Sequence, residues 1–170
     1  MKGMPSTSSA RNTRLPFDPV WLFPATYALH LAEEYFAVGG FALWGKGALG
    51  IQLSDREFLV WNTVAFGLLC LGALLVSRYP RLRLIEIGIA IAVLGNAAAH
   101  IVGSLATWTY SPGLVTGVGV WIPLGWLRLH TVSRKSSRSA RVAGTGIGIL
   151  VTLAILAVLM LTAVGAAPAR

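Results

Sequence analysis

Five long apolar runs constrain the fold of this chain more than any other feature of its sequence. They cover residues 19–43, 58–77, 84–107, 113–129 and 142–165. A helix needs roughly 20 apolar residues to cross the hydrocarbon core of a membrane, and each run approaches or exceeds that length. Of the 170 residues, 55% are hydrophobic and only 12% are charged, unlike a soluble domain. The sequence therefore predicts an all-α fold, a polytopic membrane helix bundle with about five transmembrane helices.

The chain is expected to form one domain, because it contains no repeat, no long linker and no second compositional regime. We place the transmembrane bundle at residues 19–165. The polar, Ser- and Arg-rich residues 1–18 are expected to form a flexible cytoplasmic tail, and residues 166–170 a short C-terminal tail. Ser54 to Glu57 resemble a capping box ahead of the second apolar run.

Basic residues gather in alternate connections between the apolar runs. Those that fall on one side of a five-span bundle are Lys2, Arg11, Arg14, Arg78, Arg81, Arg83, Arg128, Arg134, Lys135, Arg138 and Arg141. Cytoplasmic loops of membrane proteins are enriched in Lys and Arg, so we expect a cytoplasmic N-terminus and a C-terminus outside. The net charge of +8 then reflects orientation and contact with anionic membrane lipid, and we expect no nucleic-acid partner.

The stretch HLAEE places three ionisable residues, His30, Glu33 and Glu34, inside the first apolar run. On an α-helix, which turns by about 100° per residue, all three project from one face. Ionisable side chains that face lipid cost on the order of several kcal/mol, so this face should point into the bundle. The third run offers partners in Asn96 and His100, which are four residues apart and share a helical stripe.

Histidine and carboxylate side chains are good ligands for Zn²⁺, Fe²⁺ and Mn²⁺. Two histidines with one or two glutamates and an open position are typical of a catalytic metal site. We therefore expect a mononuclear divalent metal site whose ligands are His30, His100 and either Glu33 or Glu34. The other glutamate would act as a general base, and Asn96 would orient a ligand or the substrate.

Tyr110 is expected near the outer mouth of this polar cluster, because Pro112 and Gly113 signal a turn between the third and fourth runs. It could donate a hydrogen bond to substrate or to a glutamate as a catalytic residue. Alternatively, it is an aromatic residue of the membrane interface. Both interpretations are left open by the sequence.

Three motifs carry a resemblance to a known family: HLAEE, the histidine of NAAAH, and YSPG at residues 110–113. This combination resembles the HXXEE-domain family of small polytopic membrane proteins, which has an H-x-x-E-E motif, a further histidine and a Y-x-P-G motif. The matching residues are His30, Glu33, Glu34, His100, Tyr110, Pro112 and Gly113. The likeness covers roughly residues 17–165. It implies a fold group but no reaction, since the activity of the family is uncharacterised.

The leading hypothesis for function is a metal-dependent membrane enzyme, a hydrolase or an oxidoreductase, that acts on a lipidic or apolar small molecule. A pocket near the membrane midplane is reached most easily from the hydrocarbon, which suggests this substrate class. Metal-free acid–base isomerisation remains open. Two alternatives from other classes are an ion- or proton-coupled transporter or channel and a non-catalytic membrane subunit with a structural polar network. Away from the site, Glu86 is expected to pair with Arg83, and His130 has no catalytic part.

Overall fold

The structure is a computed structural model that describes residues 17–164 of the chain. All regular structure in this range is helical, which confirms the predicted all-α fold. The elements in chain order are η1 (Pro19–Trp21), α1 (Leu22–Phe36), η2 (Ala37–Gly39), α2 (Phe41–Leu49), α3 (Asp55–Arg78), η3 (Pro80–Leu82), α4 (Arg83–Thr107), α5 (Leu114–Thr116), the π-helical turn η4 (Gly117–Trp121), α6 (Ile122–Ser133) and α7 (Arg138–Val164). The tails expected at residues 1–18 and 166–170 lie outside the described residues, apart from Phe17 and Asp18.

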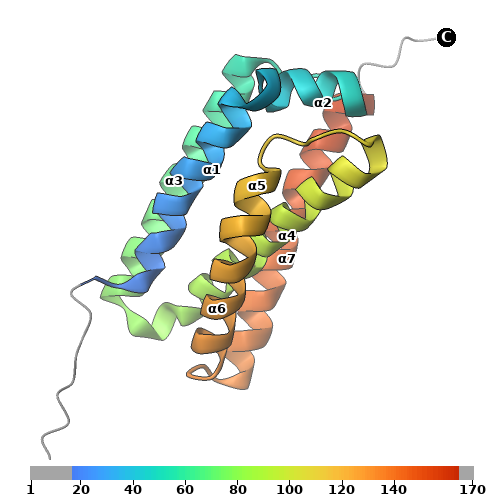
Figure 1. Ribbon diagram of the computed structural model, residues 1–170. Helices are drawn as coiled ribbons and strands as arrows, with labels where there is room; N and C mark the ends of the chain where they lie inside the picture. The colour runs from blue at the N-terminus through green and yellow to red at the C-terminus, as the bar shows by residue number, and fades with distance from the viewer. Residues whose placement is uncertain (1–16, 165–170) are drawn as a thin grey trace, which may run out of the picture.

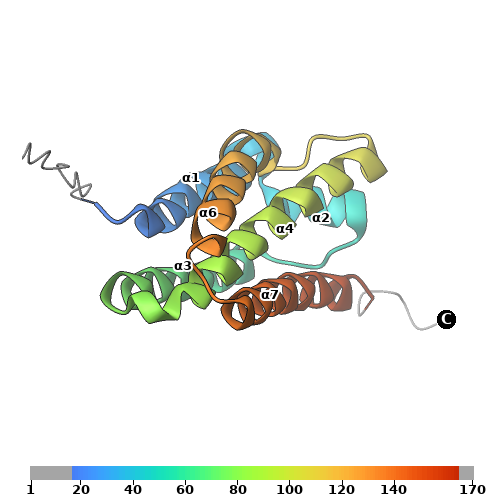
Figure 2. The same cartoon turned by 90° about the horizontal axis from the view of Figure 1, so that it is seen from below.

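The helices form an elongated bundle in which α4 runs between α6 and α7 (Figures 1 and 2). The neighbouring helices α1 and α3 are joined through α2 at one end of the molecule (Figure 1). The turn from α4 to α5 lies at that same end (Figure 1). The α3–α4 and α6–α7 connections lie at the opposite end, which we call the basic end because it carries residues 78–83 and 133–141.

Three helical stretches among the described residues are long and apolar enough to cross a membrane: Asp55–Arg78, Pro80–Thr107 and Arg138–Ala163. They support the prediction of a membrane protein. The predicted count of about five spans is not confirmed, because α1 has 15 residues and α6 has 12.

The first apolar run differs from the single helix expected over residues 19–43. The helix α1 ends at Phe36, and a second helix, α2, begins at Phe41. Val38, Gly39 and Gly40 between them all have positive φ angles, of 52°, 84° and 92°. Two glycines adopt such angles without steric cost, and this break in the right-handed helix turns α2 across the end of the bundle (Figure 1).

The predicted capping box at the start of the second run is present. The Ser54 side chain accepts a hydrogen bond from the Glu57 backbone N–H over 3.2 Å, and the Glu57 carboxylate accepts one from the Ser54 backbone N–H over 2.9 Å. These contacts satisfy two donors that a helix end leaves free, so α3 begins at Asp55.

Glycines set the contact between α4 and α7. A Cβ atom built on Gly148 would lie 2.6 Å from the carbonyl oxygen of Gly88, and one on Gly144 would lie 2.6 Å from that of Leu84. Small residues at such positions allow two membrane helices to approach closely. On the other face of α4, a buried apolar cluster joins it to α1, α3 and η4; its members are Val20, Phe23, Ala73, Val76, Ala90, Val93, Ala97 and Trp121.

The partner of Glu86 is Arg128 and not Arg83, which corrects the sequence expectation. Arg128 donates from Nε to Glu86 Oε1 over 2.8 Å, and its Nη2 also contacts that oxygen. Arg83 instead donates to the backbone carbonyl of Lys135 over 3.4 Å. The sequence favoured the nearest basic residue on the same helix, whereas the packing of α6 on α4 brings a residue from 42 positions away.

Candidate functional site

The HLAEE motif lies on the C-terminal half of α1, and the side chains of His30 and Glu34 face the bundle interior. The two residues are one helical turn apart, which places them on the same face. The Nε2 atom of His30 lies 3.5 Å from Oε1 of Glu34. His30 is 1% exposed and Glu34 is 6% exposed, so the pair is shielded from the surroundings.

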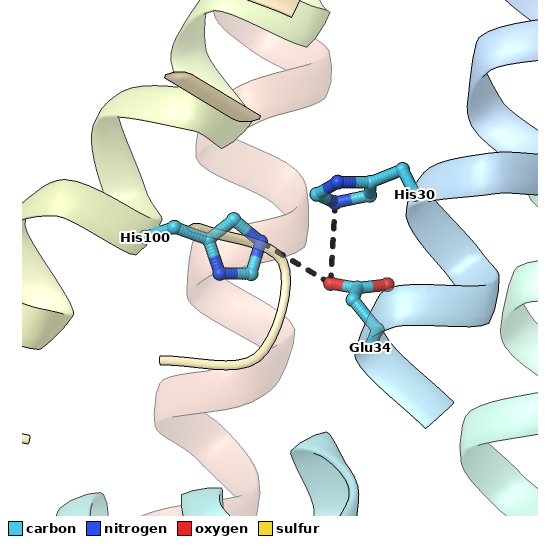
Figure 3. Close-up of side chains that lie close together, drawn as sticks. All are labelled: His30, Glu34 and His100. Atoms are coloured by element: carbon cyan, nitrogen blue, oxygen red, sulfur yellow. Dashed lines mark ion pairs between the residues drawn. The ribbon is translucent and has the colours of Figure 1, made fainter. Parts of the chain in front are cut away.

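His100 joins this pair from α4, as Figure 3 shows. Its Nε2 atom lies 3.2 Å from the same Glu34 oxygen, and its side chain is also buried. One ligand atom from each of His30, Glu34 and His100 lies within 4.8 Å of the others. The structure therefore brings together three of the four residues that the sequence singled out as metal ligands, and we call His30, Glu34 and His100 the His–Glu–His cluster.

Glu33 points to a different partner, the turn that leads from α4 into α5. Its Oε1 accepts from the backbone N–H groups of Gly113 and Val115, over 3.1 and 2.9 Å, and from the Tyr110 hydroxyl. Its Oε2 accepts from the backbone N–H of Thr116 over 2.7 Å and from the Thr116 hydroxyl over 2.5 Å. The N–H groups at the start of a helix have no partner within it, and here a carboxylate from α1 supplies one.

Tyr110 is held by Glu33 and is not part of the His–Glu–His cluster. Burial of the ring, followed by its hydrogen bond to Glu33, raises the pKa of Tyr110 to about 12. The phenol therefore keeps its proton at neutral pH and acts as a donor. Tyr110 and Gly113 both donate to Glu33, so the YSPG turn and the HLAEE motif of α1 are in direct contact.

Each histidine of the cluster has a hydroxyl group at its second ring nitrogen. The Nδ1 atom of His30 lies 2.7 Å from the hydroxyl of Thr116, and Nδ1 of His100 lies 2.9 Å from that of Ser111. Such contacts fix the orientation of an imidazole ring and leave Nε2 to face the site. Both Nε2 atoms are directed at the same carboxylate oxygen (Figure 3).

Gly113 covers the two imidazole rings from the α4–α5 turn. A Cβ atom at this position would lie 2.6 Å from Cε1 of His100 and 2.9 Å from Cε1 of His30. The residue also has a φ angle of 101°, which L side chains rarely adopt. The glycine of the YSPG motif is thus required by backbone shape and by the space that the site needs.

Aromatic rings close the site on two further sides. Trp121 stacks on His30, with ring centroids 3.8 Å apart and an interplanar angle of 28°. Phe41 of α2 meets His100 edge-on, with centroids 6.0 Å apart. The π-helical turn η4 ends at Trp121, and such turns often occur at functional sites.

Asn96 lies one turn from His100 on α4, but it makes no hydrogen bond with the cluster. Its Oδ1 is buried and has no hydrogen-bond partner among the described residues. Its proposed part in orienting a ligand therefore stays a prediction. His130 lies near the end of α6 and outside the cluster.

The sequence did not single out Thr116, Ser111 or Trp121, although all three contact a cluster histidine. Ser111 lies within the YSPG motif, and Thr116 follows its glycine by three residues, which is close to one helical turn. A search for hydroxyl side chains beside a motif glycine would have found two of them. Trp121 carries no such signal, because it is one of six tryptophans in the chain and no motif residue lies beside it in the fourth apolar run.

The donor set of the cluster suits a divalent transition metal. Two imidazoles and one carboxylate are ligands for Zn²⁺, Fe²⁺ or Mn²⁺, and three protein ligands leave a position open. The Nε2 atom of His30 is buried and has no hydrogen-bond partner among the described residues. A buried polar atom in that situation is costly, and a bound cation would satisfy it.

Comparison with known proteins agrees with the motifs. A family model described as "Protein of unknown function with HXXEE motif" matches residues 21–128, which is more than half of the chain. Neither the curated proteins nor the solved structures include a match to this chain. The matched region contains the complete His–Glu–His cluster and the turn that covers it. The chain belongs to this family of proteins with an HXXEE motif.

Proposed function

We propose that the protein binds one divalent transition-metal ion through Nε2 of His30, a carboxylate oxygen of Glu34 and Nε2 of His100. The observation that carries this proposal is the convergence of three buried ligand atoms within 4.8 Å of one another. The imidazole nitrogens and the carboxylate oxygen bring lone pairs close together, and a cation among them attracts all three. The metal would be Zn²⁺, Fe²⁺ or Mn²⁺.

We propose further that the site is catalytic and acts on a lipidic or apolar small molecule. A bound metal with an open position supplies Lewis-acid or, for iron, redox chemistry, which fits a hydrolase or an oxidoreductase. An apolar groove of about 600 Å³ lies between α4 and the helix that starts at Leu114, and it offers such a molecule an apolar surface close to the α4–α5 turn. Its lining includes Ser104 and Val115, which flank the α4–α5 turn.

The two glutamates receive different parts in this proposal. Glu34 is the ligand, because its oxygen faces both histidines. The oxygens of Glu33 are filled by donors from the α4–α5 turn, so we give this residue the part of holding the turn and not that of a general base. Tyr110 acts with Glu33 in the same attachment.

We also propose that the chain crosses the membrane five times, with the basic end in the cytoplasm. The continuous helix of residues 114–133 is roughly 30 Å long at 1.5 Å per residue, which is close to the thickness of the hydrocarbon core. The helical stretch of residues 19–36 is only slightly shorter. Together with the three long helices they would form the predicted bundle over residues 19–165 and place the C-terminus outside.

The rival proposal of an ion- or proton-coupled transporter has less support. A transport path needs polar groups that reach both faces of the membrane. Toward the basic end, His30 is followed by the buried apolar cluster that contains Phe23, Val93 and Ala97. A non-catalytic subunit would need the same residues only for packing, and the experiment below separates it from a metal site.

The metal content of the purified protein tests the proposal. We expect near-stoichiometric Zn, Fe or Mn by elemental mass spectrometry of detergent-purified wild type. Glu34→Gln should lose the metal while keeping its helical content and its size-exclusion profile. His130→Ala is the matched control, because it removes a histidine outside the cluster and should keep the metal. Folded wild type that takes up none of the three metals after reconstitution would rule out the metal site.

A further inference from the structure

We infer that Thr116 is a positioning residue that links Glu33 to His30 and fixes which nitrogen of His30 carries the proton. In this arrangement Nδ1 of His30 is protonated and Nε2 presents a lone pair to Glu34 and His100. The inference rests on the proposed metal site, because it explains how one of the ligands is prepared. It also gives the first glutamate of the HXXEE motif a role that differs from that of the second.

The first step is the state of Glu33. Its two oxygens accept from five donors, which are the backbone N–H groups of Gly113, Val115 and Thr116 and the hydroxyls of Tyr110 and Thr116. A carboxylate offers about four lone-pair sites, so these donors leave no place for a proton on either oxygen. Glu33 is therefore an acceptor in every one of these contacts.

The second step is the direction of the hydrogen bonds at Thr116. A hydroxyl group has a single proton to donate and two lone pairs with which to accept. The Thr116 hydroxyl lies 2.5 Å from Oε2 of Glu33 and 2.7 Å from Nδ1 of His30. Since Glu33 can only accept, the hydroxyl proton goes to Glu33. The contact with His30 must then be made by a proton on Nδ1.

The third step is the consequence for the site. A neutral imidazole with a proton on Nδ1 has a lone pair on Nε2. That atom of His30 is buried and lies 3.5 Å from a carboxylate oxygen of Glu34, which also offers only lone pairs. In the neutral ring, the Nε2 lone pair and the carboxylate oxygen can both bind one metal ion. The hydrogen bonds from Thr116 to Glu33 and from His30 to Thr116 thus keep Nε2 of His30 free to bind a metal ion.

Among the described residues, His100 has no equivalent series of hydrogen bonds that leads to a carboxylate. Its Nδ1 lies 2.9 Å from the Ser111 hydroxyl, but no carboxylate contacts that hydroxyl among the described residues. The Ser111 group can therefore donate or accept. The two histidines differ in this respect, although both contact Glu34, and a substitution at Thr116 should act mainly through His30.

Substitutions at Thr116 test the inference through metal affinity. Thr116→Val keeps the shape but removes the hydroxyl, and it should weaken binding of Zn²⁺ by about 10- to 100-fold, as loss of a group that orients a ligand typically does. Thr116→Ser keeps the hydroxyl and should restore affinity to near the wild-type value. Thr63→Val is the matched control, because within residues 17–164 the Thr63 hydroxyl is hydrogen-bonded only to the carbonyl of Leu59 on α3. Equal affinity in Thr116→Val and wild type would overturn the inference.

A second measurement does not depend on metal binding. Nitrogen NMR of metal-free protein with ¹⁵N-labelled histidine reports which ring nitrogen carries the proton, and the His30 signal is assigned by its loss in His30→Gln. We expect the Nδ1–H form in wild type and Thr116→Ser, and a change in Thr116→Val. A proton on Nε2 in neutral wild-type His30 would contradict the inference. The Nδ1–H form in a wild type that binds no metal would uphold it while the proposed metal site failed.

Discussion

At Gly113, backbone conformation and the space inside the site impose the same requirement. Its φ angle of 101° lies where residues with a Cβ atom are strained, and the missing side chain leaves room for both imidazoles. The backbone N–H groups of Gly113 itself and of Val115 donate to Glu33. A change at this single residue therefore affects the turn, the histidines and the attachment to α1.

The substitution Gly113→Ala should loosen the turn and disturb the cluster. The positive φ angle alone is expected to cost about 1–2 kcal/mol of stability, and the new methyl group must also displace His100 or His30. We expect a lower thermal unfolding temperature and weaker Zn²⁺ binding, measured by thermal scanning with and without the metal. Gly119→Ala is the control, since a Cβ atom there meets nothing within 4 Å. Unchanged Zn²⁺ binding in Gly113→Ala would show that the glycine does not shape the site.

The residues of the site were only partly predictable from the sequence. His30, Glu34 and His100 could be named because intramembrane ionisable groups are costly and helical spacing puts them on inward faces. The different contacts of Glu33 and Glu34 could not be predicted. Adjacent residues differ by about 100° around a helix, and only the position of the α4–α5 turn decides which carboxylate meets it. The role of Thr116 could not be predicted either, because only its contacts with Glu33 and His30 in the folded protein identify it as part of the site.

Among the elements, α7 depends on glycine for its contact with α4. Gly144 and Gly148 lie against the backbone of α4. A Cβ atom on Gly146, between them, would meet no atom of the described residues within 4 Å outside the adjacent backbone of its own helix. The three glycines look alike in the GTGIG stretch. Their difference follows from helical geometry, because residues four apart share a face and the residue between them points elsewhere.

Two alanine substitutions on α7 should have opposite effects. Gly148→Ala introduces a methyl group at 2.5 Å from Cβ of Ile91, so the helices must separate and the protein should lose stability, by about 1–3 kcal/mol for overpacking. Gly146→Ala should gain about 0.5–1 kcal/mol, because alanine favours the helix. Unfolding of both variants in detergent, followed by circular dichroism, checks the difference. Equal effects of the two substitutions would mean that α7 does not pack on α4 through this face.

Element boundaries were well predicted where one apolar run makes one helix. The run at 84–107 corresponds to α4, Arg83–Thr107, and the run at 58–77 lies within α3, which a recognisable cap extends to Asp55. The first run predicts one helix that includes Gly39 and Gly40, whereas in the structure α1 ends at Phe36 and α2 begins at Phe41. The positive φ angles of the two glycines, with that of Val38, divide the run into α1 and α2. Hydropathy does not register such a break, since glycine and valine are both compatible with membrane segments.

For the whole molecule, the proposed orientation follows from the position of the basic residues. The α3–α4 and α6–α7 connections lie at the same end of the molecule (Figure 1). Arg81, Arg134 and Lys135 lie in these connections, and Arg83 donates to the backbone carbonyl of Lys135. The opposite end carries α2 and the α4–α5 turn (Figure 1). The charge asymmetry that the sequence suggested is therefore an asymmetry between two ends of the bundle.

Labelling of single cysteines tests the orientation. In a Cys70→Ser background, we would place one cysteine at Gln52, between α2 and α3, and another at Ser137, between α6 and α7; both positions are exposed. An impermeant thiol reagent added to intact cells should label Gln52→Cys and should label Ser137→Cys only after permeabilisation. The reverse pattern would invert the proposed topology, and labelling of both from outside would exclude an odd number of crossings between them.

The attachment of Glu33 has a consequence for biosynthesis. The donors that satisfy this carboxylate all come from residues 110–116, and the first of them follows it by 77 positions in the chain. During translation, α1 is therefore complete long before its partners have been made. A glutamate without partners favours water over hydrocarbon. In the proposed five-span topology, α1 would therefore settle in the bilayer only after the turn between α4 and α5 has left the ribosome, although α1 is made long before that turn.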